Sequence, residues 1–341
     1  MKTPSSKKAR TLGALGERGF IKKILSSSAS AGPAFLVPPG DDAVVLRNPG
    51  RSVLSIDGLT DGTHFRSRWA RRCAALGGFS LGRGLGWKVL GCSLSDLAAM
   101  GRTTRRWAMI YLGAPGATSL KFLEELQRGT REAARRFDCA LAGGDTVRAK
   151  DISLVAAVGG ELAGKRALKR SGARPGDLLC VAGIVGDASI GLKLLDGKIS
   201  VPSKTDAAHF VRSFFDPRPM FAAGAILSAE NAVTSAIDLS DALKDSVEII
   251  CEASGRGARV NVDDVPVSAA YRRWFKLDAS LLTGGEDYAL LFTLQARALS
   301  RLRRRLTFSV IGRIVPRGHK VRYYRKGRTS PLNPISFQHF R

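Results

Sequence analysis

The acidic residues of this chain are few, and they gather in short turns beside glycine and serine. Only 29 Asp and Glu stand against 54 Lys and Arg in 341 residues. Six turns nevertheless carry carboxylates: Gly40-Asp41-Asp42, Ser55-Ile56-Asp57, Ser93-Leu94-Ser95-Asp96, Gly143-Gly144-Asp145, Asp238-Leu239-Ser240-Asp241 and Gly284-Gly285-Glu286-Asp287. Most of them follow a run of residues typical of a β-strand. Because strand ends converge at the edge of a sheet, the pattern predicts an α/β fold in which these carboxylates meet.

These turns contain the ligands that a divalent cation requires. Mg²⁺ takes hard oxygen ligands and keeps water and phosphate in its shell. Taken singly, each turn is more often a helix N-cap or a tight turn, where Asp, Ser and Gly are the ordinary residues. Six together favour several Mg²⁺ ions that bridge polyphosphate oxygens, since phosphoryl transfer depends mainly on positioning and charge neutralisation.

The length and the hydrophobic pattern indicate two domains. A chain of 341 residues exceeds the usual size of one hydrophobic core. The segment 164–177 is basic and punctuated by Gly and Pro, which predicts a junction there and domains at 1–164 and 165–341. Apolar residues recur with helical spacing over 85–100, which would place Asp96 near the end of a helix.

The charge and the cysteines bear on partners and location. A net charge of +25 attracts polyanions. The basic residues are dispersed, however, and no basic motif interleaved with aromatic residues occurs, so we expect nucleic acid to bind only non-specifically. The five cysteines form no CxxC pair, which predicts reduced core residues and a cytoplasmic protein. No apolar run reaches the ~18 residues of a membrane span, so no membrane association is expected.

Neither of the two common phosphate-binding signatures is present in the sequence. The chain has no GxxxxGKS or GxxxxGKT loop, and no GxGxxG follows a strand and opens a helix. The glycine-rich run 82–86 has the wrong spacing. A kinase with this sequence would therefore belong to neither the P-loop nor the protein-kinase class.

Seven segments, in this order along the chain, resemble the thiamine-monophosphate kinase family: GDDAVV (40–45), SIDGLTDGTHF (55–65), GWKVLGCSLSDLAAMG (86–101), LAGGDTVR (141–148), KRSGARPGD (169–177), IDLSDAL (237–243) and GGEDYALLF (284–292). The family belongs to a superfamily that includes aminoimidazole ribonucleotide synthetase and selenophosphate synthetase. The resemblance implies a two-domain α/β fold like that of aminoimidazole ribonucleotide synthetase, with a C-terminal α/β sandwich domain. It also implies a homodimer whose N-terminal domains pair into a β-barrel, with the ATP sites near that interface.

The resemblance also implies roles for individual residues. The Mg²⁺ ligands would be Asp42, Ser55, Asp57, Asp96, Asp145, Asp238 and Asp241. ATP would contact Gly144, Asp145, Arg170 and Ser240. Thiamine monophosphate would contact His64, Glu286 and Phe337. The catalytic carboxylates would be Asp57, Asp96, Asp145 and Asp241.

The chemistry of the ligand-contacting residue types agrees with these implied roles. His64, in a turn after Asp57, can donate to a phosphate, although a histidine there is also typical of a polar core residue. Glu286 can accept from the exocyclic N–H of an aminopyrimidine. Phe337 offers a ring face, or else anchors the tail of the chain. Arg170 presents a planar donor fork suited to phosphate.

Three positions depart from the family pattern. Ile56 stands where Ser or Thr is usual beside the metal-binding Asp57, so one Mg²⁺ site would lose a hydroxyl ligand or use water. Ala242 replaces the usual Gly after the second aspartate of the DxSD motif. Gln127 stands where an aromatic residue often flanks the adenine, which puts stacking of the base in doubt.

The implied reaction is direct in-line attack of a phosphate oxygen of thiamine monophosphate on the γ-phosphorus of ATP, without a covalent intermediate. The second pKa of a phosphate monoester lies near ~6, so no strong general base is needed. Two alternatives stay open: another ATP-dependent enzyme of the superfamily with a different nucleophile, and a basic nucleic-acid-binding protein that has lost catalysis. The carboxylate turns argue against the second, because a protein that binds the phosphate backbone has no use for converging carboxylates.

Overall fold

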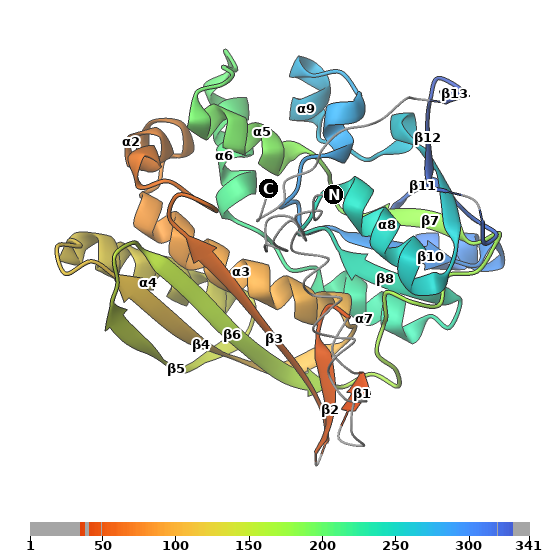
Figure 1. Ribbon diagram of the computed structural model, residues 1–341, viewed down its shortest axis with the longest axis horizontal. Helices are drawn as coiled ribbons and strands as arrows, with labels where there is room; N and C mark the ends of the chain where they lie inside the picture. Colours follow the sequence, from red (N-terminus) through yellow and green to blue (C-terminus); the bar gives the residue numbers. More distant parts are fainter. Residues whose placement is uncertain (1–34, 38–40, 49, 319, 330–341) are drawn as a thin grey trace, which may run out of the picture.

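The computed structural model describes residues 35–37, 41–48, 50–318 and 320–329. Two β-sheets, each accompanied by helices, make up the molecule (Figure 1). This arrangement confirms the predicted two-domain α/β fold. Phe337 lies outside the described residues.

The first sheet has six strands in the order β1-β2-β3-β6-β4-β5. Its strands are β1 (Phe35–Val37), β2 (Val44–Asn48), β3 (Gly50–Thr60), β4 (Thr103–Ala114), β5 (Cys139–Arg148) and β6 (Ser153–Leu162). The β4–β5 pair is parallel and the other neighbouring pairs are antiparallel. A parallel pair needs a long crossover, and helix α4 (Leu120–Arg136) provides it.

The second sheet has seven strands in the order β13-β12-β9-β11-β7-β10-β8. Its strands are β7 (Leu178–Ala182), β8 (Val233–Asp238), β9 (Gly257–Asn261), β10 (Leu290–Leu294), β11 (Ser309–Val315), β12 (Arg322–Arg325) and β13 (Arg328–Thr329). The strands β7 and β10 are buried along their whole length and are apolar except for Thr293, as expected for the middle of a covered sheet.

The remaining helices connect these strands. The longer ones are α3 (Leu81–Ala99), α5 (Asp187–Asp196), α6 (Lys204–Phe215), α7 (Phe221–Ala229), α8 (Leu243–Ser254), α9 (Ala269–Trp274) and α10 (Leu299–Arg303). Short turns of helix are η1 (Ser67–Trp69), α2 (Ala70–Arg72), η2 (Cys73–Gly77), η3 (Val262–Asp264), η4 (Ala279–Leu282) and η5 (Ala296–Ala298).

Helix α3 lies between the two sheets and is buried on nearly every side, as its mostly apolar sequence requires. Ser80 caps it by accepting a hydrogen bond from the backbone N–H of Arg83, so the helix begins four residues before the predicted start at 85. It contacts α4, β3 and β6 as well as β8 and α7 (Figure 1). The approach to α4 requires glycine, because a Cβ on Gly86 would come within 2.0 Å of the Leu126 carbonyl oxygen.

Two acidic segments lie inside strands, which corrects the prediction that they form turns after strands. β3 continues to Thr60 and pairs Asp57 with Ala156 of β6. β5 continues to Arg148 and pairs Asp145 with Tyr111 of β4. In both cases a neighbouring strand supplies backbone hydrogen-bond partners, so the chain stays extended through residues that alone favour turns.

The face of the first sheet that points away from α3 carries exposed apolar side chains. Ile56 and Met109 lie in register through Ala157 of β6 and are 68% and 47% exposed. Val147 of β5, on the same face, is also exposed. We call this the outer face and define it by Ile56, Met109 and Val147.

The irregular segment 163–177 connects β6 with β7, and the domain limits at 1–164 and 165–341 stay a prediction. All five cysteines are buried and free, which confirms that they are core residues. Within the described ranges, no helix is both long and apolar enough to cross a membrane.

Candidate active site

Three aspartates from distant parts of the chain meet between the two sheets. Asp42 precedes β2, Asp96 lies near the end of α3, and Asp238 is the last residue of β8. Each offers a carboxylate oxygen, and these oxygens all lie within 4.8 Å of one another. Elements of both sheets therefore build one carboxylate cluster, as the sequence predicts.

The cluster contains buried oxygens that lack hydrogen bonds. Within the described part of the chain, Asp42 Oδ2 and Asp238 Oδ1 have no hydrogen-bond partner. Their companion oxygens are engaged, since Arg170 Nε donates to Asp42 Oδ1 at 2.6 Å and Ser95 Oγ donates to Asp238 Oδ2 at 2.7 Å. A buried acceptor without a partner costs about 1–3 kcal/mol, and more when it is charged. The donor set therefore fits a hard divalent cation such as Mg²⁺.

Burial disfavours ionisation of these carboxyl groups. It raises the pKa of Asp42 and of Asp96 well above 3.8, and it raises the pKa of Asp238 to about 6. Repulsion from Asp238 raises the pKa of Asp42 and Asp96 further, whereas the charge of Arg170 opposes the shift at Asp42. At neutral pH the fully ionised cluster therefore needs additional positive charge.

Strand β3 directs two further predicted ligands toward the cluster. Ser55 Oγ donates a hydrogen bond to Asp96 Oδ2. Burial raises the pKa of Asp57 to about 6, and repulsion between Asp57 and Asp238 adds to this shift. Ile56, between them, lies on the outer face, because successive residues of a strand point to opposite faces. The hydroxyl that Ile56 lacks would thus lie on the opposite face of the sheet from Ser55 and Asp57.

The loop after β8 and the segment between the domains border the cluster. Ser240 is half-buried and Asp241 is exposed, and the charge of Asp241 raises the pKa of Asp238. Ala242 is the N-cap residue of α8 with φ −61°, a conformation that needs no glycine. Arg170 forms an ion pair with Asp42, and its backbone N–H donates to both oxygens of Asp41 at 3.1 Å.

Glu286 lies in a loop that packs against the loop after β8. Its backbone N–H donates to the Ser240 carbonyl at 2.8 Å, and the Tyr288 N–H donates to the Leu239 carbonyl at 2.9 Å. Glu286 and Tyr288 have φ angles of +67° and +50°, which non-glycine residues adopt at a cost of about 1–3 kcal/mol each and chiefly at functional sites. The fold therefore fixes the backbone from which the Glu286 side chain extends.

Lys88 contacts the predicted site residue Glu286, and the sequence prediction did not include it. Its side chain is fully buried in α3, and Nζ donates to Glu286 Oε2 at 2.7 Å and to the Phe214 carbonyl at 2.6 Å. The charge of Glu286 raises the pKa of Asp57 and the charge of Lys88 lowers it, which places this ion pair near the carboxylate cluster. The sequence did contain a signal for Lys88: in GWKVLGCSLSDLAAMG it lies seven residues before Ser95, which puts the two side chains on one helix face.

His64 lies in the turn that follows β3 and is half-buried. Its ring Nδ1 accepts a hydrogen bond from the backbone N–H of Thr60 at 3.1 Å. In the neutral imidazole the proton is then on Nε2, which makes Nε2 a donor. This tautomer suits the predicted contact with a phosphate oxygen.

Gly144 and Asp145 do not join the cluster within one chain. Both are exposed on β5, and strands β6 and β4 separate β5 from β3. Three strand spacings correspond to about 14 Å along the sheet. Asp145 pairs with Tyr111, two residues beyond Met109, so it also lies on the outer face and not on the face of Asp57. Gln127 is exposed on α4.

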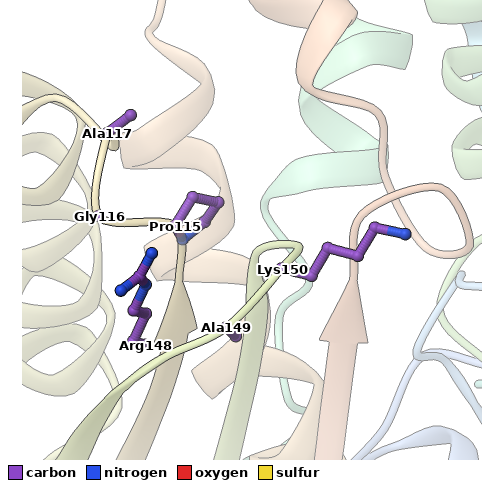
Figure 2. A pocket seen from close by; sticks show the side chains of 6 residues that line it. All are labelled: Pro115, Gly116, Ala117, Arg148, Ala149 and Lys150. Atoms are coloured by element: carbon purple, nitrogen blue, oxygen red, sulfur yellow. The ribbon is translucent and has the colours of Figure 1, made fainter.

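A separate open hollow lies beyond the ends of the parallel strands β4 and β5. It has a volume of about 650 Å³, and its lining residues are Pro115, Gly116, Ala117, Arg148, Ala149 and Lys150. Figure 2 shows the Arg148 and Lys150 side chains extending in different directions from its wall. The lining contains two cationic groups and none of the residues of the carboxylate cluster, so the two features are distinct.

Comparisons with known proteins give the relatives of this chain. A family model described as AIR synthase related protein, N-terminal domain, matches residues 40–162, and the corresponding C-terminal domain matches residues 174–325. The thiamine-monophosphate kinase of Salmonella typhimurium is 35% identical over 285 residues, which cover 82% of this chain and 83% of that protein. The crystal structure of thiamine-monophosphate kinase from Stenotrophomonas maltophilia K279a is 29% identical with a TM-score of 0.70, covering 91% of this chain and 96% of that chain. AaThiL complexed with AMPPCP and TMP has the same fold, with a TM-score of 0.80 at 24% identity over 98% of this chain and 100% of that chain.

Proposed function

Because the chain belongs to the thiamine-monophosphate kinase family, we propose that it transfers the γ-phosphoryl group of ATP to thiamine monophosphate, which yields thiamine diphosphate and ADP. The observation that carries the proposal is the convergence of Asp42, Asp96 and Asp238, with two buried oxygens lacking partners. The complex of AaThiL with AMPPCP and TMP supports a site for a nucleotide and a thiamine phosphate in this fold.

The carboxylate cluster would hold several Mg²⁺ ions. Asp42, Asp96 and Asp238 are the central ligands, and Ser55, Asp57 and Asp241 border them. Bound Mg²⁺ would neutralise polyphosphate charge, so that two anions can approach each other. We assign the catalytic role among these groups to Asp57, Asp96 and Asp241.

The residues around the cluster bind and orient the two substrates. Arg170 and Ser240 contact the ATP phosphates. The Arg170 guanidinium is now paired with Asp42, and a phosphate can replace this carboxylate because the planar pair of N–H donors fits both groups. His64 Nε2 donates to the phosphate of thiamine monophosphate, and Glu286 accepts from its pyrimidine amino group. Phe337, outside the described residues, covers the ring. The attacking phosphate oxygen is already ionised at neutral pH, so no protein group has to remove a proton.

We further propose that two copies of the chain pair through the outer face. Ile56, Met109 and Val147 leave an apolar surface on a sheet whose other face is covered, and such a patch is typical of an interaction surface. In size-exclusion chromatography with light scattering, Met109→Arg should yield monomers. Leu120→Arg is the matched control, because Leu120 is equally apolar and 74% exposed on α4, away from the outer face. A Met109→Arg protein that stays dimeric would overturn the pairing.

The pairing would explain Asp145. Within one chain Asp145 lies on the outer face and Gly144 is its exposed neighbour on β5, so both would serve the ATP site of the partner subunit. Asp57→Asn and Asp145→Asn proteins should each be inactive, and mixing them with subunit exchange should restore activity, up to about a quarter of wild type by random pairing. Absence of recovery in verified mixed dimers would place Asp145 in the site of its own chain or in no site.

An assay of ADP release tests the proposed function directly. We expect ADP and thiamine diphosphate in equal amounts when ATP, Mg²⁺ and thiamine monophosphate are all present, and no ADP without thiamine monophosphate. ADP release that requires a different nucleophile would indicate another enzyme of the superfamily. We place the activity in the cytoplasm, and the five free, buried cysteines support that location.

A further inference from the structure

We propose that Lys88 is a positioning residue for the thiamine end of the substrate. It fixes one oxygen of Glu286, so that the other oxygen is presented to the pyrimidine amino group as an oriented acceptor. The inference rests on the proposed function and deepens it, because it assigns substrate discrimination to a residue that cannot touch the substrate. The Lys88 side chain is fully buried, whereas that of Glu286 is 25% exposed.

The surroundings of Lys88 leave its ammonium group one arrangement. Nζ donates to Glu286 Oε2 at 2.7 Å and to the Phe214 carbonyl at 2.6 Å, and it lies 3.6 Å from the centroid of the Phe214 ring. An ammonium group has three N–H donors, and the two acceptors and the aromatic ring engage all three. Glu286 Oε2 is therefore held at a fixed point relative to α3.

The other half of the Glu286 carboxylate is available. Among the described residues, Glu286 Oε1 accepts no hydrogen bond, although Oε2 is engaged. The backbone at Glu286 is held in the left-handed region and is tied to the Ser240 carbonyl. A loop that constrains the backbone and a lysine that constrains one oxygen together leave the second oxygen with a defined direction.

Stability alone does not account for this ion pair. A buried lysine is costly to desolvate, and replacing a buried ion pair by apolar side chains is often neutral or stabilising. A charged, oriented acceptor, in contrast, discriminates strongly between a ligand that donates a hydrogen bond and one that does not, because the unmatched carboxylate would remain unpaired. The pair thus favours a pyrimidine with an amino group over one with an oxo group at that position.

The test is the Lys88→Met variant, which keeps the length of the side chain and removes its charge. The KM for thiamine monophosphate should rise about tenfold or more, the size expected for a hydrogen bond to a charged group, with the KM for ATP within about twofold of wild type. The preference for thiamine monophosphate over its analogue with an oxo group in place of the pyrimidine amino group should fall by a similar factor. In a Glu286→Ala background, Lys88→Met should have no further effect on the KM for thiamine monophosphate or on the preference over the oxo analogue.

Ser93→Ala is the matched control. Ser93 is likewise buried and hydrogen-bonded in α3, through Val89 and Ala156, but it does not contact Glu286. It should leave the KM for thiamine monophosphate unchanged. Should Lys88→Met fail to fold, Phe214→Leu removes the ring beneath the ammonium and should raise the same KM about two- to threefold, again only when Glu286 is present.

The outcomes separate the inference from the proposed function. Wild-type protein that releases no ADP with thiamine monophosphate contradicts the function itself. A different case is a wild type that turns over normally while Lys88→Met or Phe214→Leu raises the KM for ATP and the KM for thiamine monophosphate equally, or raises the latter by the same factor with and without Glu286→Ala. Either result overturns only the role of Lys88.

Discussion

The Asp57→Asn substitution removes one charge from the site while keeping the shape of the side chain. Burial raises the pKa of Asp57 from an ordinary 3.8 to about 6. A difference of about 2 pKa units corresponds to about 3 kcal/mol of unfavourable free energy when the carboxylate is ionised in the folded protein. Without Mg²⁺ at pH 8, Asp57→Asn should therefore raise the free energy of unfolding by up to about 3 kcal/mol, although it abolishes turnover.

The pH dependence of this gain follows from the direction of the shift. A carboxyl group whose pKa is higher in the folded than in the unfolded protein favours folding when protonated. The penalty is therefore absent below pH 3.8, grows between pH 3.8 and about 6, and is complete above that. The difference in stability between Asp57→Asn and wild type should be small near pH 4 and largest near pH 8.

Thermal unfolding in EDTA at several pH values, followed by circular dichroism, measures this difference, and the ADP assay measures turnover. Asp138→Asn is the control, because that carboxylate is 93% exposed and its neutralisation should change stability little at any pH. Added Mg²⁺ should stabilise wild type more than Asp57→Asn, since binding to the folded state shifts the unfolding equilibrium. A variant that is less stable than wild type at pH 8, or that still turns over, would refute the electrostatic reasoning.

Three further predictions concern the substrates and the charge. Glu286→Ala should raise the KM for thiamine monophosphate with little effect on the KM for ATP; a change mainly in the KM for ATP would mean that Glu286 faces the nucleotide. Arg170→Gln should raise the KM for ATP about tenfold or more, since it removes a charged donor fork. Steady-state kinetics with varied ATP would detect this change. An unchanged KM for ATP would mean that Arg170 serves only its ion pair with Asp42. RNA should bind weakly in filter-binding titrations and lose affinity steeply between low and physiological salt without changing turnover, whereas a Kd below roughly 10⁻⁷ M at physiological salt would indicate a specific partner.

The sequence predicted that acidic residues from distant parts of the chain would converge. Asp42, Asp96 and Asp238 lie at the border of a strand or on a helix, and these positions converge in the fold. Local patterns thus located the residues that lie at the ends of elements. The pairing of the loops around Ser240 and Glu286, in contrast, became visible only in the structure.

The sequence could not predict what depends on neighbours in space. The runs around Asp57 and Asp145 contain glycines that favour turns, and only the adjacent strands β6 and β4 keep them extended. Lys88 looked like an ordinary helix residue, because its partner Glu286 is 198 positions away in the chain. The face on which Ile56 and Asp145 lie likewise became visible only with the strand register.

Helix α3 relates the two halves of the site to each other. It carries Lys88, which holds Glu286, and Asp96, a member of the carboxylate cluster. Eight residues of α-helix separate these positions by about 12 Å, and the helix is clamped against α4 and both sheets, so this separation is rigid. An extended thiamine monophosphate molecule spans a comparable length between its pyrimidine ring and its phosphate. We therefore expect helix α3 to fix the distance between Glu286 and the carboxylate cluster. A substrate whose amino group reaches Glu286 then places its phosphate at the cluster, and a shorter phosphate ester cannot contact both.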